Sequence, residues 1–281
     1  MNSDELCLIK LGGAAITDKT KDYTMRPEII SSVLNEISYS DKKAIIIHGA
    51  GSFAHNIAKE YKLVHGLDSA VARDLQYRGV SITRRSLLNL HTAVLDSALE
   101  ANLLPFSFPV SAIFVSDGEQ QLYSKYLDGV VEALDKGFTP ILYGDISFDI
   151  KTHFRVISGD RILRVLVKHL KGLKHKDNSL YFNNIKVFFG SNVDGLYDKD
   201  PKNEDAKLID YITNNQIAEL IETAGESAGT DVTGGMKGKL MEIKQISDLG
   251  SEVQIMNIME EDRMYHALVN EPDIRTVITP N

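Results

Sequence analysis

Runs of wholly apolar residues alternate with helix-like segments along most of this chain, and this alternation limits the fold more than any other feature of the sequence. Strands that are apolar throughout and are separated by helices indicate an α/β fold, with a mostly parallel sheet covered by helices on both faces. The expected strands are Leu6–Leu11, Ala44–His48, Leu104–Phe108, Thr139–Tyr143, Ile185–Phe189, Val253–Asn257 and Thr276–Ile278. The expected helices are Pro27–Ile37, Phe53–Tyr61, Leu75–Ala101, Tyr126–Lys136, Asp160–Leu170, Asn215–Thr223, Gly238–Leu249 and Glu261–Val269.

The chain shows no repeat and no linker-like tract, so we expect one domain of residues 1–281 with two lobes, 1–170 and 171–281. A hairpin is expected at Val115–Tyr123, turning through Asp117 and Gly118. In sheets of this kind ligands bind at the carboxyl ends of the strands. The loops that follow the strands are therefore the expected place for a site.

Composition and charge exclude several classes of protein. With 43% apolar and 25% charged residues, the chain is an ordinary globular protein. A net charge of −8 argues against a general nucleic-acid-binding protein, whose domain is normally basic. No apolar stretch approaches the roughly 20 residues that span a bilayer, and the chain begins with nothing that resembles a secretory leader. We expect a cytoplasmic protein that binds neither nucleic acid nor membrane, and an inert, buried thiol at Cys7.

The first glycine loop, Lys10–Lys19, directly follows an apolar strand and contains Gly12 and Gly13. Glycine permits tight turns and lets a ligand approach the backbone closely. With a lysine at each end and exposed N–H groups between them, the loop suits an anion, and polyphosphate is the best candidate. Considered alone, the loop also fits an ordinary α/β turn with two solvated lysines.

The second glycine loop, His48–His55, follows the next strand and opens a helix through Gly49, Ala50 and Gly51. The N–H groups of a first helical turn have no partner within the helix and lie at the positive end of its dipole, which favours phosphate. His55 is placed to donate to the same anion. His48, at the end of the strand, is expected to be a structural histidine with its hydrogen bonds satisfied.

Two further motifs have both a structural and a functional interpretation. Ser158-Gly159-Asp160 precedes an apolar helix, so it fits an N-cap; alternatively, Asp160 holds two lysine ammonium groups at a reaction centre. Asp194 and Tyr197 follow an apolar strand as the adenosine side of a nucleotide site would, although Asp-Gly is also an ordinary turn.

The last loop, Asp231–Lys239, combines glycines, a threonine and lysines ahead of a helix, and on its own it also fits a flexible surface loop. It is not a Walker A loop, because GxxxxGK[ST] occurs nowhere in the chain. A nicotinamide oxidoreductase is disfavoured too, since no GxGxxG follows the first strand.

Taken in order, these motifs resemble the amino acid kinase superfamily over nearly the whole chain, and within it they are most similar to the isopentenyl phosphate kinases. The matching segments are KLGGAAIT with Lys19 after it, HGAGSFAH ending in His55, YGDI at Tyr143–Ile146, VISGD at Val156–Asp160, and DVTGGMKGK at Asp231–Lys239. The resemblance implies a three-layer αβα sandwich around a mostly parallel sheet. It also implies that the acceptor binds on the N-terminal lobe and ATP on the C-terminal lobe, in a homodimer.

The resemblance implies roles for the matching residues. Lys10, Lys19 and Lys239 would contact the transferring phosphoryl group and the ATP phosphates. Asp160 would orient the lysines, and His55 would bind the acceptor phosphate. Close backbone would come from Ala50, Gly51 and Gly159. The expected ATP-binding residues are Lys10, Gly12, Gly13, Gly51, Asp194, Tyr197, Gly234 and Lys239.

The implied reaction transfers the γ-phosphoryl group of ATP to isopentenyl phosphate, with Mg²⁺ on the ATP phosphates and few direct protein ligands to the metal. An isoprenoid tail needs an apolar pocket, whose expected wall residues are Val80, Thr83, Ile146 and Val156; a plain core role is as good an interpretation of these four. The alternatives are a fosfomycin-type phosphonate kinase and a non-catalytic protein that binds a nucleotide or an oxyanion on the same fold.

The chain departs from the family pattern at three places. Ala50 and Ala54 stand where glycine is usual, and Ala50 adds a methyl group near the acceptor. Ser191 and Asn192 stand where Thr-Asp is usual, so a carboxylate near the nucleotide is missing. The resemblance therefore supports the phosphoryl-transfer residues more fully than it supports the adenine and metal contacts.

Overall fold

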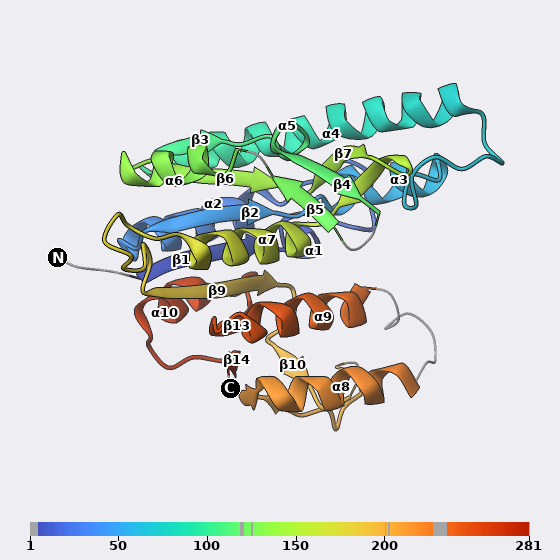
Figure 1. Ribbon diagram of the computed structural model, residues 1–281. Helices are drawn as coiled ribbons and strands as arrows, with labels where there is room; N and C mark the ends of the chain where they lie inside the picture. Colours follow the sequence, from blue (N-terminus) through green and yellow to red (C-terminus); the bar gives the residue numbers. More distant parts are fainter. Residues whose placement is uncertain are drawn as a thin grey trace.

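A central sheet of eight strands, in the order β12-β14-β13-β9-β1-β2-β6-β3, runs through the computed structural model (Figure 1). The structure describes residues 5–118, 121–124, 126–199, 201, 203–226 and 235–280. Every neighbouring pair in the sheet is parallel except β13 and β14, which confirms the mostly parallel sheet. The strands are β1 (Glu5–Leu11), β2 (Ala44–His48), β3 (Pro105–Ser107), β6 (Thr139–Tyr143), β9 (Asn184–Ser191), β12 (Tyr211–Thr213), β13 (Val253–Asn257) and β14 (Thr276–Thr279).

Helices cover both faces of this sheet, and the alternation of side chains in β1 shows why. Leu6 and Leu8 are buried in one core, whereas Cys7 and Ile9 are buried in another on the opposite face. The first core is closed by α6 (Asp128–Asp135), α7 (Gly159–Gly172), α8 (Asn214–Glu226) and α9 (Gly235–Asp248). The second is closed by α2 (Pro27–Tyr39), α4 (Arg73–Glu100) and α10 (Arg263–Val269). The three-layer αβα sandwich is confirmed.

Two hairpins form a second, four-stranded sheet with the order β5-β4-β7-β8 (Figure 1). The expected hairpin is confirmed as β4 (Phe114–Asp117) and β5 (Gln121–Ser124), with Asp117 opposite Gln121. The sequence analysis missed the other hairpin, β7 (Asp145–Asp149) and β8 (His153–Ile157). Its alternation is obscured because Asp145, Ser147 and Asp149 are all buried polar residues.

The short elements after β1 and β2 differ in detail from the expected helices. The loop after β1 forms the single-turn helix α1 (Gly13–Ile16). The helix expected at Phe53–Tyr61 is divided into a 3₁₀ turn, η1 (Gly51–Phe53), and α3 (His55–Glu60). The division falls at Ala54, whose backbone is not helical. Helix α3 therefore begins at the next residue, His55.

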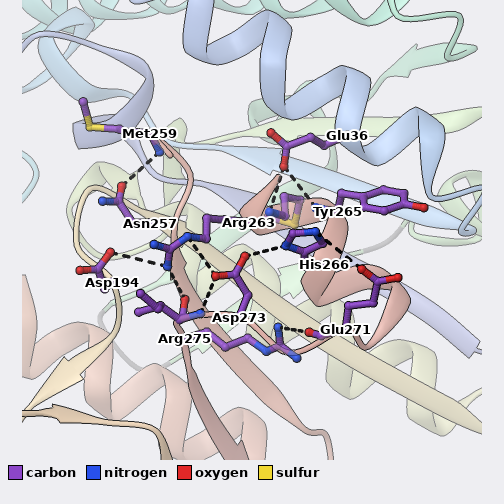
Figure 2. Close-up of polar contacts among 12 residues, drawn as sticks. Glu36, Asp194, Asn257, Met259, Arg263, Tyr265, His266, Glu271, Asp273 and Arg275 are labelled. Carbon is purple, nitrogen blue, oxygen red and sulfur yellow. Dashed lines mark hydrogen bonds and ion pairs between the residues drawn. The ribbon is translucent and has the colours of Figure 1, made fainter. Parts of the chain in front are cut away.

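The end of the chain is attached to the first half through a buried carboxylate. Glu36 of α2 accepts hydrogen bonds from the backbone N–H groups of Met264 and Tyr265, at 2.9 and 3.2 Å (Figure 2). These N–H groups lie in the first turn of α10, where no intrahelical acceptor exists. Burial raises the pKa of Glu36. The carboxylate therefore joins α10 to α2 on one face of the sheet.

The parallel register brings three strand ends to one edge of the sheet. Leu11, the last residue of β1, lies opposite His48 of β2 and Gly190 of β9. The loops that follow these strands consequently lie side by side. Among the helices that the structure describes, none has both the length and the apolarity needed to cross a membrane.

Candidate phosphoryl-transfer site

The two glycine loops pack backbone against backbone at this edge. The N–H of Gly12 donates to Gly190 O, and the N–H of Gly49 donates to Leu11 O, each at 2.8 Å. A Cβ on Gly13 would lie 2.4 Å from the backbone nitrogen of Gly51, and one on Gly49 would lie 2.6 Å from that of Gly13. No side chain fits between these backbones, so glycine is required at both positions.

Gly51 is constrained further by its conformation and by a threonine. Its φ of +51° lies in the left-handed region, which glycine adopts without strain. A Cβ there would lie 1.9 Å from the hydroxyl of Thr17. That hydroxyl donates to Gly13 O at 2.6 Å and accepts from the N–H of Ser52 at 3.0 Å. Thr17 thus joins the first glycine loop to the second.

Asp160 forms an ion pair with Lys10 across the sheet edge. Lys10 is the residue before the end of β1, and Asp160 lies in the first turn of α7. Ser158 caps the same helix by accepting from the N–H of Arg161 at 3.2 Å. The N-cap interpretation of the Ser158-Gly159-Asp160 motif is confirmed. Asp160 also pairs with one of the two lysines expected of the functional interpretation, Lys10, and its role at a reaction centre stays a prediction.

Further positive groups lie close to this ion pair. Burial and the nearby charges of Lys10 and Lys19 lower the pKa of Lys239 to about 8, while Asp160 acts in the opposite direction. Burial and the charge of Lys19 also lower the pKa of His55. Three lysines and a histidine thus lie within electrostatic reach of one another, with Asp160 among them.

These groups line one cavity of about 910 Å³, and most of the predicted site residues lie in its wall. The cavity is bounded by both glycine loops, the start of α7, α9 and the β7–β8 hairpin. The structure brings together Lys10, Gly12, Gly13, Lys19, Ala50, Gly51, His55, Thr83, Ile146, Val156, Gly159, Asp160 and Lys239.

Val80 does not lie in that wall. It lines a neighbouring cavity of about 630 Å³ with Tyr77 and Phe148, and it packs against the small cluster that contains Ile146 and Phe154. Thr83, one turn later on α4, does line the main cavity, and its hydroxyl donates to Gly79 O at 2.8 Å. The two positions therefore face different spaces.

Asp194 and Tyr197 also lie outside the wall of the main cavity. The hydroxyl of Tyr197 donates to Asp194 at 3.2 Å, and the other carboxylate oxygen of Asp194 lies 3.9 Å from Arg263 of α10 (Figure 2). Arg263 also pairs with Asp273 at 3.2 Å. The loop after β9 is thus tied to the C-terminal part of the chain. Gly234, the remaining predicted site residue, lies outside the described residues.

Two carboxylates of the cavity wall had no predicted role. Asp145 begins β7 and lies 3.4 Å from Arg84 of α4, and burial raises its pKa. Glu242 lies one turn after Lys239 on α9 and forms an ion pair with Arg164, one turn after Asp160 on α7. This pair joins the two helices that carry Asp160 and Lys239. The i, i+3 spacing from Lys239 is the sequence signal that could have identified Glu242.

A comparison with known proteins identifies the family. The model of the amino acid kinase family matches residues 5–175 and 180–257. The chain is 31% identical to isopentenyl phosphate kinase of Methanothermobacter thermautotrophicus, over 98% of this chain and 99% of the relative. It is 30% identical to that of Thermoplasma acidophilum, over 92% and 94%.

Solved structures give the same result. An isopentenyl phosphate kinase structure superposes with a TM-score of 0.79 at 25% identity, over 97% of this chain and all of the other. The product complex of the T. acidophilum enzyme superposes with a TM-score of 0.72 at 26% identity, over 97% and 99%. The chain belongs to the amino acid kinase family.

Proposed function

We propose that this protein is an isopentenyl phosphate kinase, which transfers the γ-phosphoryl group of ATP to isopentenyl phosphate. The observation that carries the proposal is the set of positive groups around Asp160 in one cavity: Lys10, Lys19, Lys239 and His55. Relatives that bear this name are similar over nearly the whole chain, which supports the choice of acceptor. The products are isopentenyl diphosphate and ADP.

The reaction needs positioning and charge stabilisation more than it needs a base. A phosphate monoester has its second pKa near 6, so it reaches the site largely ionised. One of its oxygens attacks the γ-phosphorus in line, and the bond from that phosphorus to the β–γ bridging oxygen breaks as ADP leaves. The chemical difficulty is the repulsion between two anions. Lys10, Lys19 and Lys239 counter that repulsion with preorganised charge.

We assign the acceptor to the N-terminal lobe and the nucleotide to the C-terminal lobe. His55 would donate to the acceptor phosphate, with Ala50, Gly51 and Gly159 as close backbone. The apolar tail would lie along Thr83, Ile146 and Val156, which already line the cavity. The ATP-binding set would be Lys10, Gly12, Gly13, Gly51 and Lys239, together with Asp194, Tyr197 and Gly234.

Mg²⁺ would enter with the nucleotide. Across the described ranges, no group of three or more His, Cys, Asp or Glu side chains is arranged to hold a metal ion. Asp160, a carboxylate of the cavity wall, is already paired with Lys10. This donor set fits phosphate better than a bare cation, so phosphate oxygens would supply most ligands to Mg²⁺. When bound, the metal would neutralise charge on the ATP phosphates.

We further propose that the protein is a cytoplasmic homodimer. β3 lies at one edge of the central sheet: it pairs with β6 on one side, and on its other side it has no strand partner among the described residues. Leu104, Phe106 and Phe138 are exposed there. An exposed apolar edge of this kind favours pairing with a second copy of the chain.

A substrate panel tests the proposed function. ADP release with ATP and Mg²⁺ should show the highest kcat/KM for isopentenyl phosphate when dimethylallyl phosphate, geranyl phosphate and fosfomycin are compared with it. A preference for fosfomycin would identify a phosphonate kinase instead. No ADP release with any acceptor would identify a non-catalytic binding protein.

The lysines can be tested against a matched neighbour. We expect Lys10→Ala and Lys19→Ala each to lower kcat by roughly 10²–10³, as loss of one preorganised donor does. Lys21→Ala is the control, because the Lys21 side chain is 70% exposed and two residues from Lys19. Steady-state kinetics measure the effect. Unchanged turnover in both cavity variants would remove these lysines from the mechanism.

ATP binding should take up protons near pH 8. Lys239 has a pKa of about 8, so a large fraction is uncharged there, and bound phosphate favours the charged form. Titration calorimetry in buffers of different ionisation enthalpy measures the uptake. Lys239→Arg should bind ATP without this uptake, since arginine stays charged.

The control for this measurement is Lys237→Met, because Lys237 lies two residues earlier and is exposed. This variant should keep the wild-type uptake. The same heat of ATP binding in every buffer for the wild type would contradict the account of Lys239.

A further inference from the structure

We propose that His91 and Ser107, through His48, position the backbone of the second glycine loop for the acceptor phosphate. The three side chains come from α4, β3 and the end of β2. They form a hydrogen-bond chain that ends on the carbonyl of Gly49. The inference rests on the proposed function, because that function assigns the loop to the acceptor.

The hydrogen-bond chain is continuous, and its two histidine rings are buried. Ser107 Oγ lies 2.7 Å from His91 Nε2, His91 Nδ1 lies 3.0 Å from His48 Nε2, and His48 Nδ1 lies 3.1 Å from Gly49 O. His48 is 0% exposed and His91 4%. Tyr143 of β6 packs against both rings, with centroids 5.5 and 4.2 Å away. The rings therefore have little freedom to rotate.

When both histidine rings are neutral, only one donor-to-acceptor direction is possible along this series of hydrogen bonds. A carbonyl accepts, so His48 Nδ1 must carry the proton and His48 Nε2 must accept. His91 Nδ1 is then the donor to His48, and His91 Nε2 accepts from the Ser107 hydroxyl. Burial keeps both rings neutral, since it lowers the pKa of His48 to about 3 and that of His91 to about 4. Each atom of the chain has its partner in this arrangement.

The carbonyl of Gly49, which accepts the last hydrogen bond of the series, determines where the N–H of Ala50 points. The Gly49–Ala50 peptide is trans, so its C=O and N–H point in opposite directions. With the carbonyl held toward His48, the Ala50 N–H points away from the two buried rings. Gly49, Ala50 and Gly51 all line the cavity. The hydrogen-bond chain therefore selects the orientation in which this peptide presents its N–H, rather than its C=O, to an anion.

Backbone contacts alone do not determine this orientation. The N–H of Gly49 donates to Leu11 O, and His48 O accepts from Gly144 N at 3.0 Å. Both bonds are made by the single peptide between His48 and Gly49, whereas the next peptide, between Gly49 and Ala50, is held through His48. Loss of the donor on His91 would allow the other tautomer of His48, whose lone pair would face Gly49 O.

Variants of His91 test the proposal by separating the two substrates. In His91→Leu, we expect the KM for isopentenyl phosphate to rise on the order of tenfold, as loss of one buried hydrogen bond implies. The KM for ATP should change much less. His91→Asn places an amide donor where Nδ1 stood, so it should restore most of the acceptor KM. Thr92→Ala, on the exposed side of α4, should behave as the wild type.

A merely structural role would give a different result. His91→Leu would then lower the melting temperature while leaving the acceptor KM unchanged, or would affect both substrates equally, and either outcome would overturn the proposal. Failure of the proposed function can be distinguished from failure of this positioning role, because in the first case the wild type itself would not turn over isopentenyl phosphate.

The tautomers give a second test that needs no variant to fold. ¹⁵N NMR of the unliganded wild-type protein at neutral pH should show the Nδ1–H tautomer for both His48 and His91. An Nε2–H tautomer or a charged ring at either position would contradict the proposed direction of the chain.

Discussion

The proposed site depends on the ion pair between Asp160 and Lys10, which places a carboxylate among the lysines of the cavity wall. Burial and the nearby charges of Lys10 and Lys19 lower the pKa of Lys239 to about 8. Asp160 offsets part of this repulsion through its ion pair with Lys10. In the proposed function, the positive charge that remains would be neutralised by the phosphate groups of the two anionic substrates.

The two glycine loops line the same cavity. Because the backbones of Gly13 and Gly51 touch, the N–H groups of both loops are presented at one edge of the sheet. Thr17 joins the two loops through its hydroxyl. In our proposal His48 sets the orientation of the Gly49–Ala50 peptide from behind. Lys10, Lys19 and His55 lie at or after the carboxyl ends of the parallel strands β1 and β2, where ligands bind in such sheets. Lys239 comes from α9.

Much of this arrangement could be predicted from local patterns in the sequence. Apolar runs separated by helices indicated the sheet, and the glycine loops directly after β1 and β2 had to lie together because those strands are parallel neighbours.

What could not be predicted depends on contacts between residues that are distant in the sequence. His48 and His91 are 43 residues apart and meet only because α4 packs across β2. Val80 and Thr83 line different cavities, because the rotation of α4 about its axis relative to the β7–β8 hairpin determines which of its side chains face each cavity. The roles of Asp194 and Tyr197 remain predictions.

The most direct measurement is a crystal structure with a non-hydrolysable ATP analogue and isopentenyl phosphate bound together. The account predicts both phosphates in the cavity, with the Nζ atoms of Lys10 and Lys19 about 3 Å from the γ-phosphate oxygens. It also predicts that His55 donates to the acceptor phosphate. A complex in which either phosphate binds away from these side chains would contradict it.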